Sequence, residues 1–232
     1  IIVPMKDTGP DMDLVESLIS KDASIKGIWC VPKYSNPTGI SYSNDTVERF
    51  AKLKPKAKDF RIFWDNAYFI HDLDENGDNI LNIFKECKKY GNEDMPIIYC
   101  STSKITFPGS GISAFVASEN NMKNIKKIFS TKIIGFDKIN QLRHALFLQD
   151  KDKVLDHMRE HSKLLKPKFE LVLRILNSEF SDSDIVTWSN PKGGYFISVN
   201  VLKGCAKRVY ELCKLAGLKL TPAGATYPRG FD

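Results

Sequence analysis

The chain has 232 residues and a formal net charge of +6, with 42% hydrophobic and 27% charged residues. These proportions are ordinary for a globular protein of one large or two small domains, and no apolar run is long enough to span a membrane. The lysines are scattered rather than interleaved with aromatic residues, so we expect neither a nucleic-acid partner nor a membrane partner.

Cysteine usage predicts reduced thiols and a cytoplasmic location. The five cysteines stand at positions 30, 87, 100, 205 and 213, with no CxxC pair, and the N-terminus has no signal-peptide pattern. His157 and His161 are four residues apart on a predicted helix, but no acidic or cysteine partner is placed to complete a metal site. We therefore expect no bound metal.

The first half of the chain alternates predicted strands with predicted helices. Short apolar runs bounded by turn residues predict strands over residues 1–5, 25–31, 60–64, 97–100 and 112–117. Helices are predicted over residues 11–19, from Asp45 with Glu48 three residues later, and from Gly77 to Gly91. We expect the strand at 60–64 to be buried on both faces of its sheet. The alternation predicts an α/β fold with a mostly parallel sheet and flanking helices.

The second half is predominantly helical. Apolar residues recur at helical spacing over residues 137–177, which predicts a nearly continuous helix that Pro167 should kink or break. A strand over 193–199, a helix over 206–216 ended by Gly217, a strand over 218–220 and a loop at 230–232 follow. We expect residues 1–150 to be part of a large domain, and residues 151–232 to be a linker helix with part of a smaller C-terminal α+β domain.

Lys104 and Asp65 each follow an apolar strand. In open α/β sheets, ligands bind at the carboxyl ends of the strands. An amine at this edge is partly desolvated, which favours the neutral, nucleophilic form, although an isolated lysine is more often a surface residue. A carboxylate at the end of a buried strand needs a partner, or it serves as a turn or N-cap residue.

Asn36 and Tyr68 stand close to these strands in the sequence. Asn36 precedes a proline and is followed by Gly39, a residue that tolerates positive φ, so residues 36–39 form a turn. Tyr68 is three residues beyond Asp65, and local sequence alone allows it to be a core aromatic beside Phe69.

The order of these motifs resembles the pyridoxal 5'-phosphate (PLP) site of the class I/II aminotransferases, which are fold-type-I PLP enzymes. The motifs are Asn-Pro-Thr-Gly at 36–39, Trp-Asp-Asn-Ala-Tyr at 64–68, Ser-Thr-Ser-Lys at 101–104 and Pro-Lys-Gly-Gly-Tyr-Phe at 191–196. The resemblance implies an aspartate-aminotransferase-like large domain followed by part of the small domain. It covers nearly all of this chain.

The resemblance also implies a role for each residue. Lys104 would form the Schiff base with PLP and move a proton, and Asp65 would pair with the pyridine nitrogen. Tyr68 and Asn36 would donate to the phenolic oxygen. The resemblance makes Ser101 a phosphate ligand, and Ser103 is a further candidate. The catalytic set is then Lys104, Asp65 and Tyr68, and the cofactor-binding set is Asn36, Asp65, Tyr68, Ser101, Ser103 and Lys104.

One position departs from the family pattern. Most relatives carry an arginine that grips the phosphate where this chain has Gly111, and no arginine occurs between Lys104 and Arg143. The sequence of residues 102–109 resembles a bacterial aspartate-aminotransferase-like subgroup more closely than it resembles the commonest family members. The family's substrate-carboxylate arginine would lie beyond residue 232, and residue 1 is not a methionine, so we expect a fragment that is poorly active alone.

The leading functional hypothesis is a PLP-dependent aminotransferase that moves an amino group from an amino acid, possibly aspartate, to a 2-oxo acid. Family members form homodimers, so a homodimer is expected for the full-length protein. A PLP-dependent lyase would carry the same four residues, and only product analysis separates the two. An aminotransferase-like effector domain of a transcription regulator is a further alternative, and a silent structural homologue is the last.

Overall fold

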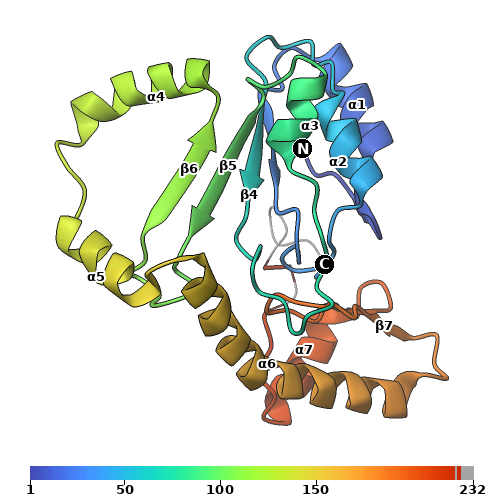
Figure 1. Ribbon diagram of the computed structural model, residues 1–232. Helices are drawn as coiled ribbons and strands as arrows, with labels where there is room; N and C mark the ends of the chain where they lie inside the picture. The colour runs from blue at the N-terminus through green and yellow to red at the C-terminus, as the bar shows by residue number, and fades with distance from the viewer. Residues whose placement is uncertain (223, 226–232) are drawn as a thin grey trace.

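The computed structural model describes residues 1–222 and 224–225 and is built around a four-stranded sheet (Figure 1). The strand order is β3-β4-β5-β6, and the strands are β3 (Gly27–Cys30), β4 (Arg61–Asp65), β5 (Pro96–Ser101) and β6 (Ser113–Ala117). The first three are parallel, and β6 runs antiparallel to β5. The predicted α/β fold with a mostly parallel sheet is confirmed.

Helices α1 (Met12–Lys21), α2 (Asn44–Ala51) and α3 (Ile83–Lys89) cover one face of this sheet (Figure 1). The core between these helices and the sheet contains residues that the helical and strand patterns place inward, among them Val15, Val47, Phe50, Ile62, Trp64 and Cys87. Burying each large apolar side chain contributes roughly 1.5–3 kcal/mol. The core therefore fixes the position of β4 and the direction in which its end points.

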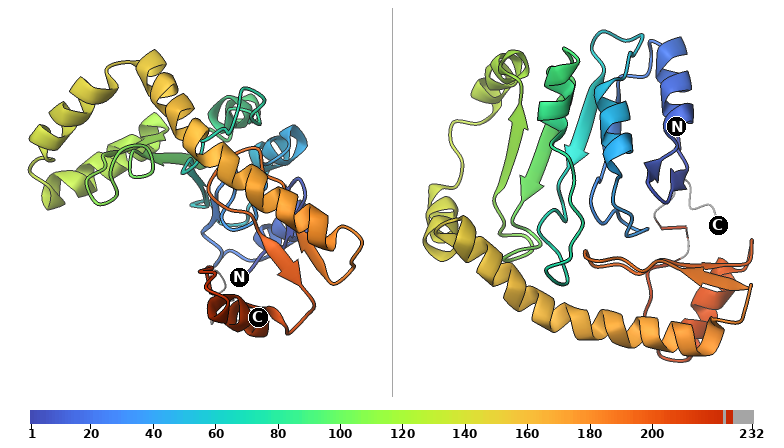
Figure 2. Two further views of the ribbon diagram at one scale, coloured as in Figure 1. Left: turned by 90° about the horizontal axis from the view of Figure 1, so that it is seen from below. Right: turned by 45° about the vertical axis from the view of Figure 1, so that its right-hand side comes forward.

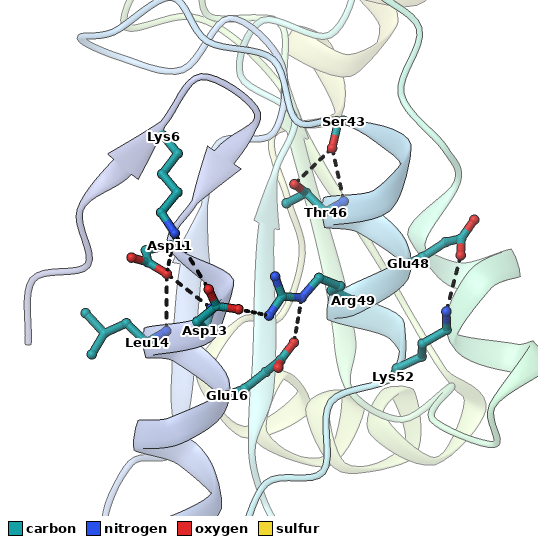
Figure 3. Close-up of polar contacts among 10 residues, drawn as sticks. All are labelled: Lys6, Asp11, Asp13, Leu14, Glu16, Ser43, Thr46, Glu48, Arg49 and Lys52. Atoms are coloured by element: carbon teal, nitrogen blue, oxygen red, sulfur yellow. Dashed lines mark hydrogen bonds and ion pairs between the residues drawn. The ribbon is translucent and has the colours of Figure 1, made fainter.

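Polar groups cap the first two helices, and others link the last turn of α2 to α1 (Figure 3). The Asp11 side chain caps α1, and Arg49 of α2 reaches Glu16 of α1 with Nε to Oε1 at 2.8 Å. Ser43, not Asp45, caps α2, because its hydroxyl accepts the backbone N–H of Thr46 at 3.1 Å. The predicted helix start at Asp45 is therefore wrong by one residue, and that aspartate lies in the first turn.

The expected two-sided burial of the strand at residues 60–64 is wrong. Ile62 and Trp64 point into the core, whereas Phe63 faces the opposite side of the sheet and is only half-buried. There its ring stacks with Trp29, which is 61% exposed, and with Tyr99, at centroid separations of 5.7 and 6.3 Å. Within the described residues, this second face of the sheet carries a row of aromatic side chains instead of a helix layer.

The remaining elements are a short N-terminal hairpin, three helices after the sheet and a C-terminal unit. They are β1 (Met5–Lys6), β2 (Gly9–Pro10), α4 (Glu119–Lys132), α5 (Lys138–Leu148), α6 (Lys151–Phe180), β7 (Val186–Trp188), β8 (Val199–Val201) and α7 (Ala206–Leu215). Figure 2 shows α6 as a long, gently curved helix that runs from α5 beneath the sheet to the C-terminal elements. The expected helical region is confirmed, and residues 149–150 divide it into α5 and α6.

Pro167 lies inside α6 and does not end it. A proline removes the hydrogen bond to the carbonyl four residues earlier, which here belongs to Lys163. Lys163 is exposed, so water can satisfy that carbonyl and the helix continues. Of the kink or break predicted at Pro167, the break is therefore wrong, and the helix is gently curved (Figure 2).

Several predicted boundaries differ from the structure. The first strand is reduced to Met5–Lys6, α3 begins at Ile83 after its cap Asn82, residues 218–220 are not a strand, and residues 230–232 lie outside the described residues. Helix α4 was not predicted, because only Asn121 of its residues is buried and its sequence has little apolar periodicity. The division of the chain at residue 150 stays a prediction. Among the residues described, no helix is long and apolar enough to cross a membrane.

The strand predicted at 193–199 is mostly a loop, because two glycines make it turn and dock on the loops that follow β3 and β4. A Cβ on Gly193 would lie 2.1 Å from the Tyr34 ring and 2.5 Å from the carbonyl oxygen of His71. Gly194 has φ +76 and donates its N–H to that same oxygen at 2.9 Å. Only glycine allows this close approach, and strand β8 begins later, at Val199.

We expect Gly193→Ala in the full-length protein to lower the free energy of unfolding by about 1–3 kcal/mol, because its methyl group would overlap a buried ring and backbone. Gly135→Ala is the matched control, since a Cβ there meets nothing within 4 Å and its φ is also ordinary. That control should change stability by about 0.5 kcal/mol or less. Denaturant unfolding of both variants checks this, and equal stabilities would contradict it.

Candidate active site

Lys104 lies in a short loop that leaves the carboxyl end of β5. Thr102 closes the base of this loop, because its N–H donates to the Ile112 carbonyl at 2.8 Å and its hydroxyl accepts the Ile112 N–H at 2.9 Å. The parallel register pairs Asp65, the last residue of β4, with Tyr99 of β5. The Lys104 loop and the end of β4 therefore lie at the same edge of the sheet.

The side chain of Lys104 points to the loop that follows β4. Its Nζ lies 4.9 Å from the centroid of the Tyr68 ring, a distance at which a cation is attracted by the ring face. Tyr68 is 2% exposed, but Lys104 is exposed. The residue as a whole is open to solvent because its loop stands at the rim of the sheet, and partial desolvation of its amine stays a prediction.

Asp65 is half-buried beside the lysine. Burial raises the pKa of its carboxyl group, and the positive charge of Lys104 opposes that effect. Hydrogen bonds from the Trp29 side chain and the Ala67 backbone act in the same sense as the lysine. A half-buried carboxylate with a raised pKa gains from a further proton donor, so it is suited to pair with a protonated ring nitrogen.

Tyr68 and Asn36 come together, as the resemblance implies. Burial is the largest cause of a raised pKa for the Tyr68 phenol, and the nearby Asp65 and Tyr195 raise it further. A hydrogen bond with the Asn36 side chain opposes the increase. Asn36 itself is exposed in the turn after β3. Side chains from the ends of β3, β4 and β5 thus converge, and the geometry brings together four of the predicted site residues, namely Asn36, Asp65, Tyr68 and Lys104.

Ser101 and Ser103 are half-buried on either side of Thr102. Gly111, the position that departs from the family pattern, packs against Ser103. A Cβ on Gly111 would lie 2.7 Å from Ser103 Oγ and 2.8 Å from its backbone nitrogen. An arginine therefore cannot stand at this position unless the loop shifts.

Histidine side chains surround the Lys104 loop, an arrangement that neither the residue patterns nor the family resemblance indicated. His71 Nε2 lies 3.1 Å from the Lys104 carbonyl oxygen, His157 Nε2 lies 2.8 Å from the Ile105 carbonyl oxygen, and His144 Nε2 lies 2.9 Å from Thr106 Oγ1. The ring of His161 lies beside that of His157, with centroids 4.6 Å apart and the two planes tilted by 60°. The four-residue spacing of His157 and His161 does not reveal this arrangement, because the histidines come from a loop and two helices. In the part of the chain that the structure describes, no group of three or more ligands could hold a metal ion.

The side chains present fit PLP. An amine can bind its aldehyde, a carboxylate can pair with its ring nitrogen, a phenol and an amide can donate to its ring oxygen, and serine hydroxyls can bind its phosphate. The buried Asn66 Oδ1, in the segment between Asp65 and Tyr68, has no hydrogen-bond partner among the described residues, so this segment retains acceptor capacity. The donor set agrees with the cofactor that the resemblance implies.

The family model described as aspartate amino-transferase matches residues 1–232. The chain belongs to this family. An aspartate aminotransferase from Corynebacterium glutamicum is 43% identical over 232 residues, which are 100% of this chain and 54% of that protein. The crystal structure of an aspartate transaminase from the same species has 42% identity and a TM-score of 0.95, and the match covers 100% of this chain and 55% of that chain.

A more distant aminotransferase shares the fold. The crystal structure of an α-aminoadipate aminotransferase from Thermus thermophilus, in complex with N-(5'-phosphopyridoxyl)-L-leucine, matches with a TM-score of 0.79 at 20% identity, over 97% of this chain and 56% of that one. The present chain spans about half the length of the curated relatives it matches.

We expect Asp65→Asn to leave the cofactor-free, full-length protein as stable as the wild type, or more stable, at neutral pH. Because burial raises the pKa of Asp65, the folded protein binds the carboxyl proton more tightly than the unfolded chain does. The wild type therefore loses stability relative to the variant as the pH rises above the ordinary value of 3.8.

Thermal unfolding of both proteins from about pH 3 to 7 measures this difference. Asp182→Asn, at an exposed position, is the control and should show no such trend. A variant that is less stable than the wild type at neutral pH would contradict the prediction.

Proposed function

We propose that the full-length protein is a PLP-dependent aminotransferase, with Lys104 as the residue that forms the Schiff base. The observation that carries the proposal is the convergence of Lys104, Asp65, Tyr68 and Asn36 at one sheet edge, in a chain of the aspartate aminotransferase family. Lys104 Nζ lies at the face of the Tyr68 ring and close enough to Asp65 for its charge to oppose the burial-driven rise in the pKa of that carboxyl group. PLP, when bound, supplies an aldehyde and an electron-withdrawing ring.

The residues of this chain have separate tasks in the proposal. Asp65 holds a proton on the ring nitrogen, Tyr68 and Asn36 orient the ring through its oxygen, and Ser101 and Ser103 bind the phosphate. The amine of Lys104, once freed, takes and returns a proton at Nζ. General acid–base catalysis of this kind contributes typically a factor of about 10² to 10⁴.

The substrates we propose are an amino acid and a 2-oxo acid, with aspartate as the first amino acid to test. The support is the similarity to the aspartate aminotransferase from Corynebacterium glutamicum. The resemblance to the family supports a cytoplasmic homodimer as the working form. The 232-residue chain alone should be poorly active, since it spans about half of that relative.

The test is borohydride reduction of the PLP-treated, full-length protein, followed by peptide mapping and product analysis. We expect a pyridoxyl label on Lys104 and conversion of aspartate and a 2-oxo acid to the exchanged pair. Release of pyruvate or of a sulfur product would instead identify a lyase. A label without turnover would favour an effector domain, and no label on Lys104 would overturn the proposal.

Lys104→Ala should lower transamination by about 10³-fold or more, because it removes both the covalent anchor and the group that moves the proton. Lys126→Ala, an exposed lysine of α4, is the matched control and should retain wild-type activity. Steady-state rates of the two variants measure the effect. A Lys104→Ala rate within tenfold of the wild type would contradict the assigned role.

A further inference from the structure

Two side chains from distant parts of the sequence hold the carbonyl oxygen of Lys104. Tyr195 donates its hydroxyl to this oxygen at 2.8 Å, and His71 Nε2 lies 3.1 Å from it. Tyr195 precedes β8 and His71 follows β4, so the Lys104 backbone is fixed by two loops other than its own. Neither residue belongs to the predicted site.

The chemistry of the contact determines the state of His71. A carbonyl oxygen only accepts hydrogen bonds, so His71 Nε2 must carry the hydrogen. Burial lowers the pKa of His71, which is 4% exposed, and favours the neutral ring. Its Nδ1 is then the bare nitrogen, and this atom is buried without a hydrogen-bond partner among the described residues. A buried nitrogen without a partner costs free energy, so the neutral ring is held at this cost. Its hydrogen bond among the described residues goes to the Lys104 carbonyl.

The rings of Tyr68, His71 and Tyr195 pack against one another edge to face. Their centroids are 5.7 Å apart for Tyr68 and His71, 5.9 Å for Tyr68 and Tyr195, and 5.2 Å for His71 and Tyr195. Lys104 contacts this triad at both ends, because its carbonyl is bound by two of the rings and its Nζ lies over the third. A movement of the Lys104 backbone would therefore carry its amine away from Tyr68.

The triad also depends on how residues 191–196 dock. Gly194 donates its N–H to the His71 carbonyl oxygen at 2.9 Å, so the segment that carries Tyr195 is tied to the segment that carries His71. The close approach of Gly193 to the Tyr34 ring brings the two segments together.

We infer that His71 and Tyr195 are positioning residues for Lys104, which hold its carbonyl oxygen so that its amine stays at the Tyr68 ring and near Asp65. This inference rests on the proposed function for its effect on turnover. The position of the amine itself can be tested without the cofactor. Loss of one hydrogen bond to the carbonyl should change the occupancy of the held position roughly three- to tenfold.

The experiment uses Tyr195→Phe, which keeps the ring and removes the donor, in the full-length protein. His71→Leu removes the other donor, and His71→Gln keeps an N–H group near the position of Nε2. Tyr90→Phe is the matched control, because Tyr90 ends α3 before β5 begins, at the opposite edge of the sheet. Competitive acylation of the cofactor-free protein gives the reactivity of Lys104 relative to Lys126, and steady-state kinetics and unfolding midpoints are measured beside it.

In Tyr195→Phe and His71→Leu, we expect Lys104 to react roughly three- to tenfold faster with the acylating reagent, because its amine no longer stays at the Tyr68 ring and near the Asp65 carboxylate. We expect kcat to fall by a similar factor while KM for the amino acid changes little. His71→Gln should restore both values, and Tyr90→Phe should resemble the wild type.

Unchanged acylation and kcat in Tyr195→Phe would overturn the inference, and so would a lower unfolding midpoint with unchanged acylation. If the wild type takes no pyridoxyl label but the variants still accelerate acylation of Lys104, the positioning role stands and the proposed function fails. If the wild type takes the pyridoxyl label but the variants acylate Lys104 at the wild-type rate, the proposed function stands and the positioning role fails.

Discussion

Parallel pairing of β3, β4 and β5 is the constraint on which the site depends. The register sets Cys30 beside Trp64 and Asp65 beside Tyr99, so three successive strands end at one edge of the sheet. The loops that leave this edge carry Asn36, Tyr68 and Lys104, which are far apart in sequence. Because the strands are aligned by backbone hydrogen bonds and by the core beneath β4, these loops start from fixed positions, and short loops are enough to bring the side chains together.

An ion pair between a buried lysine and a partly exposed aspartate links the first two of these loops. Lys33 is 6% exposed, and its Nζ lies 2.7 Å from Asp72 Oδ1, which also accepts the Tyr34 hydroxyl. Removing the Lys33 charge from water offsets much of its attraction to the partly exposed Asp72, so the pair specifies one arrangement more than it adds stability. That arrangement presents the Tyr34 ring to Gly193, and docking at Gly193 delivers Tyr195 to the Lys104 loop. The loops after β3 and β4 therefore also determine how the lysine is held.

The sequence was a good guide to several local features. The start of α1 near Asp11, the buried face of α2 and the stop at Gly217 follow from spacing and residue type. It could not reveal His71 or Tyr195, because their partner is a backbone carbonyl that is 33 and 91 residues away along the chain. It likewise failed for α4, whose polar sequence packs through Asn121 rather than through an apolar stripe. Contacts between loops depend on the finished fold, and a single sequence carries no periodic signal for them.

Gly111 shows how such contacts change the reading of a motif. From sequence alone, a glycine in place of the family's arginine looks like a lost phosphate ligand. In the structure, the Lys104 loop closes on itself at this point, since a Cβ on Gly111 would lie 2.7 Å from Ser103 Oγ and 3.0 Å from its Cα. A side chain here would push Ser103, and Ser103 precedes the residue whose carbonyl is bound by His71 and Tyr195. The glycine and the two positioning residues are thus parts of one loop geometry, and an arginine could be restored only together with a different placement of Lys104.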